Sequence, residues 1–312
     1  MSSFGGPEGL ELTELPAPQA SGDGVLVRVT LAGVNFADTH QRTDTYLAET
    51  KLPMIPGTEV SGVREDTGER VVALCGSGGY AEQVVVAAAR VFPIPDGVTD
   101  AQALALLVQG CTAWHLYRTA GRVQASESVV VHSAAGGVGT LAVQLGRLLG
   151  AGRVIATASS EAKLALAREL GADAAISGLP EGLQERLLEA NGGAKVDVVF
   201  DAAGGDIFDA SRRALAPFGR IVSYGISSRE QNELRTGQLL RGSQAVVGFW
   251  LWHCLERPGM LAAALDDLFE HVRDGSLRTL VGGIYPLSAA AQAQADLAAR
   301  VTTGKLALDV TR

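Results

Sequence analysis

Cysteine is scarce in this sequence. Cys75, Cys111 and Cys254 are widely separated and odd in number. Secreted proteins that depend on disulfides carry an even set of cysteines at short spacings. The sequence therefore excludes a disulfide framework, and it predicts a protein of the reducing cytoplasm.

An excess of positive charge is also missing. Lysine and arginine total 26 against 34 aspartates and glutamates, which gives a net charge of −8, and the basic residues are scattered. Nucleic acids and anionic membranes are bound through clustered basic residues. No apolar run reaches the length of a membrane span, and residues 1–14 lack the apolar core of a signal peptide. We therefore expect neither a nucleic acid nor a membrane as the partner.

The sequence has no motif for chemistry carried by side chains alone. It contains no G-x-S-x-G nucleophile elbow. That motif supplies an activated nucleophile. In its absence, we expect a coenzyme to supply the chemistry while the protein orients it.

Aromatic residues make up only 5% of the chain, whereas glycine occurs 38 times and hydrophobic residues reach 47%. This composition is typical of an α/β protein packed with valine, alanine and leucine, and 312 residues predict two domains. Residues 113–249 alternate between strand and helix patterns, which predicts a doubly wound parallel sheet. The expected strands are 129–132, 154–158, 174–176, 196–201, 220–224 and 244–249, and the expected helices are 138–150, 161–171, 182–191, 206–216 and 236–241.

The two ends of the chain are predicted to form one β-rich domain. The expected strands of residues 1–112 are Gly24–Ala32, Glu59–Val63, Glu69–Leu74 and Tyr80–Val86. Residues 250–312 contain one helix pattern at 259–274 and a strand at Lys305–Val310. This segment is too small to fold alone, so we expect it to pack onto the first domain. A coenzyme domain, residues 113–249, is then inserted within a catalytic domain.

The segment Val129–Gly150 carries the strongest local signal. Its sequence is VVVHSAAGGVGTLAVQLGRLLG, a short strand, a turn of small residues and an amphipathic helix. Glycines at 136, 137 and 139 allow a pyrophosphate to approach the first amides of the helix, which have no acceptor within it. The sequence AAGGVG departs from G-x-G-x-x-G, with Ala134 at the first position. An ordinary glycine turn is the alternative, and the surrounding strand–helix–strand pattern favours a dinucleotide site.

The choice of coenzyme is predicted from the end of the next strand. NAD enzymes place a carboxylate there to bind the ribose hydroxyls, and this sequence has Ala158 instead. Ser159, Ser160 and Lys163 follow, and two hydroxyls and a cation suit a 2′-phosphate. Lys163 could equally be a solvated helix residue. The pattern favours NADPH over NADH.

Short motifs are spread along nearly the whole chain. They are GVNFADTHQRTDTY from Gly33, GTEVSGV from Gly57, GERVVAL, AAGGVG, VVFDAAGG from Val198, GRIVSYG and TTGKLALDV. Together they resemble the motifs of the medium-chain dehydrogenase/reductase superfamily, in its zinc-free quinone oxidoreductase branch, to which polyketide enoyl reductase domains also belong. The resemblance implies a Rossmann coenzyme domain inserted in a GroES-like catalytic domain.

The resemblance also bears on zinc. Zinc-dependent members of the superfamily carry cysteine where this chain has Asn35, and histidine where it has Thr58. Neither amide nor hydroxyl is a good zinc ligand, and a four-cysteine zinc lobe is missing. We therefore expect no metal. Glu59, next to Thr58, is interpreted as a structural carboxylate.

The family resemblance implies two sets of site residues. Those expected to act on the substrate are Asn35, His40, Tyr46 and Gln109, beside Trp252 in a cleft between the domains. His40 stands where many relatives carry tyrosine, so its part in proton transfer stays open. The residues expected to bind the coenzyme are Thr112, Ala135, Gly136, Gly137, Val138, Gly139, Ser159, Ser160, Lys163, Gly204, Tyr224, Gly225, Phe249, Leu251 and Lys305.

Two features near the predicted substrate residues concern the backbone. Arg42 is expected to pair with Asp38 or with neighbouring carbonyl groups. Asp44 replaces a glycine of the motif R-x-G-x-Y, so the loop that carries Tyr46 is expected to differ in shape.

Three functions remain open. The first is NADPH-dependent reduction of quinones or α,β-unsaturated carbonyl compounds, with a small-molecule partner. The second is an enoyl or enone reductase of a polyketide or other secondary-metabolite pathway. The third is a non-catalytic NADPH-binding protein that resembles the lens crystallins of this branch. A homodimer is expected in each case, because Gln244–Phe249 forms an apolar edge strand that a partner would cover.

Overall fold

The computed structural model describes residues 1–312, which cluster into two compact units. Unit 1 comprises Met1–Gln109, Leu265–Asp274 and Thr279–Arg312. Unit 2 comprises Gly110–Ala264 and Gly275–Arg278. The domain boundaries that we expect after residues 112 and 249 stay a prediction.

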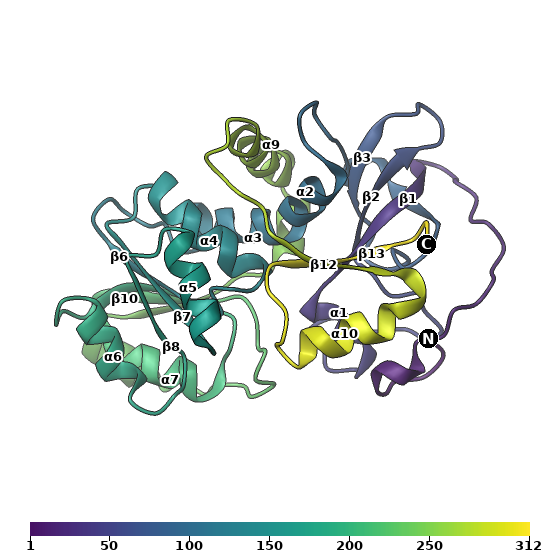
Figure 1. Cartoon of the computed structure of the whole chain (residues 1–312). Helices are drawn as coiled ribbons and strands as arrows, with labels where there is room; N and C mark the ends of the chain where they lie inside the picture. Colours follow the sequence, from purple (N-terminus) through teal and green to yellow (C-terminus); the bar gives the residue numbers. More distant parts are fainter. The chain divides into compact units, whose positions relative to one another are not determined.

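Unit 2 contains a six-stranded sheet in which all strand pairs are parallel. Along the sheet the strands follow the order β11-β10-β9-β6-β7-β8, so the chain leaves β6 first toward one side and later toward the other. Figure 1 shows this sheet with helices of the same unit beside it. This is the doubly wound order, and the prediction of the fold class is confirmed. The strands are β6 (Ser128–Val131), β7 (Arg153–Ala158), β8 (Ala174–Ser177), β9 (Val196–Asp201), β10 (Leu215–Ser223) and β11 (Ala245–Gly248).

The helices of unit 2 alternate with these strands, as a parallel sheet requires. Residues from two of them, Leu183, Leu187 and Phe208, pack with Val130 and Ile155 of the sheet in one buried cluster. None of the crossover helices is longer than twelve residues, and helices of this length are only marginally stable alone. Burial of these side chains against the sheet therefore stabilises them. The helices are α4 (Gly137–Leu148), α5 (Glu161–Glu169), α6 (Leu183–Ala190), α7 (Gly205–Ala214) and α8 (Thr236–Gly242).

Unit 1 contains a seven-stranded sheet built on one long central strand. β1 pairs antiparallel with three other strands, β2, β4 and β13. β13 also pairs in parallel with β12, so the last part of the chain becomes part of the first sheet. The strands are β1 (Gly24–Val34), β2 (Glu59–Arg64), β3 (Arg70–Leu74), β4 (Gln83–Ala87), β5 (Val91–Pro93), β12 (Val281–Pro286) and β13 (Lys305–Asp309).

Several elements are missing from our sequence-based prediction. The helical stretch from 100 to 120 is broken by two π-helical turns, Leu106–Gly110 and Leu116–Ala120, which disturb its 3.6-residue period. None of the helices combines the length and apolarity that a bilayer span requires. The helices not yet named are α1 (Phe36–Arg42), α2 (Asp100–Ala105), α3 (Cys111–His115), α9 (Met260–Arg273), and α10 (Ala290–Ala298), and the 3₁₀ turns are Pro7–Gly9, Ala88–Arg90, Leu251–Glu256 and Leu287–Ala289. Among these helices and turns, the sequence predicts only α9, as the helix pattern at 259–274.

The strand expected at Tyr80–Val86 begins only at Gln83, because Tyr80 is held outside the sheet by other hydrogen bonds. Its backbone amide donates to Pro56 O at 2.9 Å, and its hydroxyl donates to the carboxyl group of Asp38 at 2.9 Å. These bonds hold Tyr80 in a loop before β4.

The backbone at Asp44 explains the glycine of the R-x-G-x-Y motif. Asp44 has φ of +54°, in the left-handed region, where a residue with a β-carbon is strained and glycine is not. The loop at Asp44 thus keeps the conformation that glycine favours, despite the substitution.

Asp44→Gly should therefore raise the free energy of unfolding by about 1 kcal/mol, because it relieves the strain of an exposed residue. Urea unfolding of the two proteins measures this difference. Asp96→Gly is the matched control, since Asp96 is also exposed but is not among the residues of positive φ. It should lower stability, and an equal gain from both changes would contradict the explanation.

Candidate functional site

The carboxyl edge of the parallel sheet in unit 2 gathers most of the residues expected to bind the coenzyme. The strand order changes direction between β6 and β9, and ligands of doubly wound sheets bind outside the carboxyl ends of the strands at such a point. The turn after β6 and the first residues after β7, β9, β10 and β11 all lie at this edge. They include Ala135, Gly136, Gly137, Val138, Gly139, Ser159, Ser160, Gly204, Tyr224, Gly225 and Phe249.

The glycine turn after β6 is shaped by close contacts of its backbone. Gly136 caps α4, and its amide donates to Ser133 O at 2.9 Å. A β-carbon on Gly139 would lie 2.3 Å from Ser133 O and 2.6 Å from the Ala134 Cα, so only glycine fits there. The first amides of α4 have no acceptor within the helix, and they carry the positive end of its dipole. The turn can therefore bind an anionic group such as a pyrophosphate.

His132 lies between the end of β6 and this turn, and its ring makes two hydrogen bonds to neighbouring elements. It is buried, and its ring lies between the Thr157 hydroxyl, 2.9 Å from Nδ1, and the Ser211 hydroxyl, 2.7 Å from Nε2. Ser211 donates its own proton to Ile207 O at 2.7 Å, so it accepts from His132 Nε2–H. His132 Nδ1 then accepts from Thr157. This assignment holds for the neutral ring, which is the form favoured near pH 7 because burial lowers the pKa of His132 from 6.5 to about 4.

The end of β7 contains no carboxylate. Ala158 closes the strand, and the exposed Ser159 and Ser160 follow it. The Ser160 hydroxyl accepts the Lys163 amide at 3.4 Å and caps α5, which places Lys163 on the first turn of that helix. The two hydroxyls and the Lys163 side chain thus belong to one short segment at the carboxyl edge.

The ends of β9, β10 and β11 are joined by hydrogen bonds. The buried carboxylate of Asp201 accepts the amides of Ala203 at 2.9 Å and Gly204 at 3.2 Å, and burial raises its pKa. Tyr224 donates its amide to Asp201 O at 3.0 Å, and Phe249 donates to Ser223 O at 2.9 Å. A β-carbon on Gly225 would lie 3.1 Å from Ala202 O, so the turn after β10 lies directly against the turn after β9.

Two further expected coenzyme residues lie in unit 2 away from the strand ends. Thr112 is buried in α3, and Leu251 begins the 3₁₀ turn after Phe249. The ring of Phe249 lies 5.9 Å from that of His115, which is also on α3. These contacts connect α3 with the segment that follows β11.

Unit 1 holds a buried polar cluster, which consists of Asn35, Thr58, Glu59, Gln109 and Lys305. The Lys305 ammonium pairs with the Glu59 carboxylate, and it donates to Asn35 Oδ1 at 2.9 Å. Asn35 Nδ2 donates to Glu59 Oε1 at 3.0 Å and to Thr58 Oγ1 at 3.1 Å. Gln109 Nε2 donates to Asn35 Oδ1. The structure thus brings together two of the residues expected to act on the substrate, Asn35 and Gln109.

The cluster changes the role that we expected for two of its members. Lys305, expected beside the coenzyme, is only 2% exposed and bonds to Glu59, Asn35 and the Val34 carbonyl. The Asn35 amide makes two donor and two acceptor contacts, which is its full capacity. Asn35 could therefore stabilise a substrate oxygen only by losing one of these bonds.

His40 and Tyr46 lie along α1 and the loop after it. His40 Nδ1 is 3.0 Å from the Thr45 hydroxyl, and its ring packs against Phe36 at 5.4 Å. Tyr46 follows Thr45 directly and is half-buried. The hydrogen bond to Thr45 therefore links His40 to the loop that carries Tyr46.

The start of α1 is stabilised by Asp38, which we expected only as a partner of Arg42. The Asp38 carboxyl group accepts from the backbone N–H of Asn35 at 2.8 Å and from the Tyr80 hydroxyl at 2.9 Å, and burial raises its pKa to about 6. Arg42, at the other end of α1, donates to Gly5 O and to Gln294 Oε1, the latter at 2.8 Å. Of the two kinds of partner expected for Arg42, the structure thus shows a backbone carbonyl group.

The sequence contained a signal for only some of these positions. Glu59 was interpreted as a structural carboxylate, and it is fully buried. The hydrogen bonds of His132 and Asp38 to Ser211 and Tyr80 were not predicted, because these partners are 79 and 42 residues away. No group of three or more His, Cys, Asp or Glu side chains is arranged to hold a metal ion.

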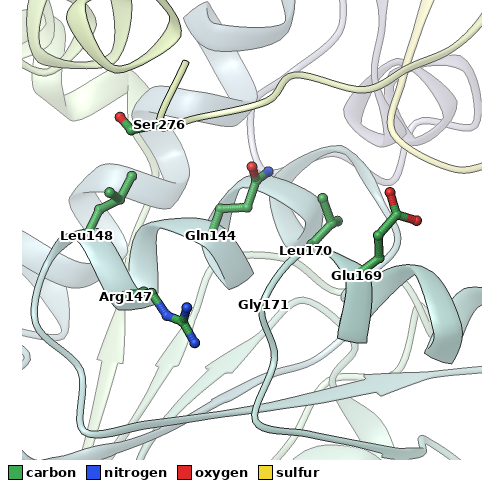
Figure 2. Close-up of a pocket in the computed structure, with 7 residues that line it drawn as sticks. All are labelled: Gln144, Arg147, Leu148, Glu169, Leu170, Gly171 and Ser276. Carbon is green, nitrogen blue, oxygen red and sulfur yellow. The ribbon is translucent and has the colours of Figure 1, made fainter. Parts of the chain in front are cut away.

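A pocket of about 220 Å³ opens in unit 2 between the carboxyl halves of α4 and α5 (Figure 2). The Gln144 side chain both donates to and accepts from the Arg278 backbone at 2.9 Å, and Arg278 pairs with Glu169 at 2.7 Å. Because α4 and α5 begin at the carboxyl edge of the sheet, this pocket lies toward the opposite edge. It is therefore separate from the candidate site. The lining residues are Gln144, Arg147, Leu148, Glu169, Leu170, Gly171 and Ser276.

Comparison with known families gives two matches. Residues 21–96 match the alcohol dehydrogenase GroES-like domain, and residues 137–270 match the zinc-binding dehydrogenase domain. A quinone oxidoreductase from Pseudomonas aeruginosa is 35% identical over 98% of this chain and 97% of its own length.

A solved structure is also similar to this chain over nearly its whole length. The quinone oxidoreductase of Escherichia coli, crystallised with NADPH, is 31% identical and superposes with a TM-score of 0.93, covering 99% of this chain and 98% of that one. Among the sequence relatives, a phenolphthiocerol/phthiocerol polyketide synthase from Mycobacterium tuberculosis is 30% identical over 97% of this chain, which corresponds to 14% of that much longer protein.

The buried histidines generate a prediction about stability and pH. Burial lowers the pKa of His132 and of His115 from 6.5 to about 4, so between these values the unfolded chain binds more protons at both. Asp38 acts in the opposite direction from pH 3.8 to about 6, because its raised pKa makes the folded chain bind the extra proton. These three groups together leave the unfolded chain with about one more bound proton near pH 5.5, so their contribution to stability should fall by about 1.4 kcal/mol per pH unit on acidification.

Urea unfolding at several values between pH 5 and 6.5 measures this slope. In His132→Asn, one of the two histidine contributions is absent, and the slope should be smaller by about 1.4 kcal/mol per pH unit. His271→Asn serves as the control, since His271 lies on α9 outside this arrangement. An unchanged slope in His132→Asn would show that the ring is not held neutral.

Proposed function

Since the chain belongs to the medium-chain dehydrogenase/reductase superfamily, within its quinone oxidoreductase branch, we propose that it is a zinc-free, NADPH-dependent reductase of quinones or α,β-unsaturated carbonyl compounds. The observation that carries this proposal is the glycine turn after β6, which lies at the switch point of the sheet and opens a helix. Relatives that share this fold at 30% identity or more include a quinone oxidoreductase crystallised with NADPH.

The residues at the carboxyl edge suit NADPH. The amides of Gly137, Val138 and Gly139 would hold the pyrophosphate, because they have no acceptor within the helix and an anion is stabilised at the start of α4. Ala158 leaves no carboxylate to repel a 2′-phosphate, and Ser159, Ser160 and Lys163 offer hydroxyl groups and a cation. When bound, this coenzyme supplies a hydride from the nicotinamide ring. The chain's part is to bind and orient it.

The residues of unit 1 suit an electron-poor acceptor. Hydride addition to a quinone or an enone places negative charge on the substrate oxygen, which hydrogen-bond donors stabilise. The Tyr46 hydroxyl and His40 are the candidate donors. Because the Asn35 amide is fully engaged with its neighbours, we assign it to positioning and not to donation. The product anion is stabilised by conjugation, so water can protonate it.

The buried cluster does not suit zinc, although one matching family is described as zinc-binding. Asn35 and Thr58 offer an amide and a hydroxyl where zinc needs thiolate or imidazole. The positive charge beside the Glu59 carboxylate comes from Lys305. A zinc ion there would need to displace both the ammonium group and the hydrogen bonds of Asn35.

Two other functions have some support. The likeness to a polyketide synthase favours an enoyl reductase, which would prefer thioesters to free quinones. A non-catalytic NADPH-binding protein would bind the coenzyme and turn over no acceptor. We also predict a homodimer that pairs through β11, because this apolar strand lies at the edge of the sheet and an exposed edge strand needs a covering partner.

The proposal is tested by measuring NADPH oxidation against a panel of quinones, enones and enoyl thioesters. We expect turnover with quinones or enones, together with much weaker activity with NADH. Activity confined to thioesters would favour the enoyl reductase, and tight NADPH binding without any turnover would favour the non-catalytic function. Failure to bind NADPH at all would reject all three.

The proposed donors should share their contribution. Tyr46→Phe and His40→Ala should each lower kcat/KM by roughly ten- to a hundredfold, because water can complete proton transfer when one donor is missing. Steady-state assays with a quinone and an enone measure this, with NADPH affinity measured in parallel. Complete loss of activity in either variant, with NADPH binding intact, would identify that residue as an obligate proton donor.

A further inference from the structure

The charges of Lys305 and Glu59 determine which way the Asn35 amide faces. An ammonium group can only donate hydrogen bonds, and an ionised carboxylate can only accept them. Asn35 lies against both, with its oxygen 2.9 Å from Lys305 Nζ and its nitrogen 3.0 Å from Glu59 Oε1. Rotating the amide by half a turn would place oxygen against carboxylate and nitrogen against ammonium. The ion pair therefore allows one orientation of Asn35.

The orientation of Asn35 then determines that of Gln109. The atom of Asn35 in contact with Gln109 is the acceptor oxygen, so Gln109 must offer its nitrogen. The carbonyl oxygen of Gln109 is therefore directed away from Asn35. This oxygen is buried and has no hydrogen-bond partner in the chain, although Gln109 as a whole is 8% exposed.

A buried carbonyl oxygen without a donor is unfavourable, and native proteins usually supply one. In Gln109 the chain holds the amide so that its oxygen stays without one. A donor from a bound molecule would complete the bonding of this group.

We infer that the Lys305–Glu59 ion pair, acting through Asn35, presents the Gln109 carbonyl oxygen to an N–H or O–H donor of a bound ligand. The inference rests on the proposed function for the identity of that ligand. Quinones and simple enones carry no such donor. The carboxamide of the nicotinamide ring carries one, and so does the hydroxyl group of a reduced quinone. Gln109 is thus a ligand-binding residue, and Lys305, Glu59 and Asn35 are positioning residues.

The first arm of the experiment tests the carboxamide as the donor. Dissociation constants are measured by fluorescence titration for NADPH and for its reduced 3-acetylpyridine analogue, which has a methyl group where NADPH has the amide nitrogen. The wild-type protein should prefer NADPH by about five- to thirtyfold, the factor expected for one hydrogen bond to a buried acceptor. Gln109→Leu should lose this preference.

The second arm tests a hydroxyl group as the donor. 1-Naphthol and 1-methoxynaphthalene are titrated against the protein saturated with NADP⁺, as stable probes with and without the O–H group. If the donor is a product hydroxyl, the wild-type protein should prefer 1-naphthol by a similar factor, and Gln109→Leu should bind both alike. A preference in either arm that depends on Gln109 supports the inference and names the source of the donor.

Positioning by the ion pair is tested with the double variant Lys305→Met, Glu59→Leu, which removes both charges together and leaves neither unpaired. Asn35 is then free to turn, so the preference between the paired probes should fall as it does in Gln109→Leu. If the double variant fails to fold, Asn35→Leu keeps the ion pair and removes the connection, with the same expected loss. The measured ratio of two affinities separates positioning from a general loss of structure.

Lys163→Ala is the matched control. It should weaken NADPH and the acetylpyridine analogue by the same factor, since both carry the 2′-phosphate. Wild-type protein that does not bind NADPH would overturn the proposed function. Wild-type protein that binds NADPH, but shows in neither arm a preference that depends on Gln109, would overturn this inference alone.

Discussion

A buried ammonium group without partners would destabilise unit 1 strongly, and Lys305 avoids this by directing its protons to the Glu59 carboxylate, the Asn35 side chain and the Val34 carbonyl. Glu59 begins β2, Val34 ends β1 and Asn35 caps α1, whereas Lys305 begins β13. The contacts of Lys305 therefore join the last strand of the chain to the first two. Because the ion pair also determines which way two amide side chains face, the arrangement of the polar cluster depends on it.

The parallel sheet of unit 2 is subject to a different constraint, which is close approach of the backbone. The turn after β6 leaves no room for a β-carbon at Gly139. The neutral ring of His132, just before this turn, is hydrogen-bonded to Thr157 of β7 and to Ser211 of α7. Burial disfavours the charged form of this ring. The surface offered to an anion is thus supported by a buried group whose protonation is held constant near neutral pH.

The two polar arrangements share one principle, which is that a neighbour committed to donating or to accepting decides how a side chain capable of both is oriented. In unit 2, the proton that Ser211 gives to Ile207 decides the tautomer of His132. In unit 1, the charges of Lys305 and Glu59 decide the orientation of Asn35 and, through it, that of Gln109. Such networks orient side chains precisely, since each alternative places two donors or two acceptors together.

The sequence alone determined the elements whose signals are local. Every predicted strand of the parallel sheet is present, most of them within two residues of the expected bounds, because alternating strands, helices and glycine turns are encoded by neighbouring residues. Short or irregular elements, such as α1, β12 and the π-helical turns around α3, carry no such period. Only the tertiary structure decided the polar cluster, since Lys305 is 270 residues from Asn35 and 246 from Glu59. The residue types suggested a site, but the direction of each amide depends on charges that folding alone brings together.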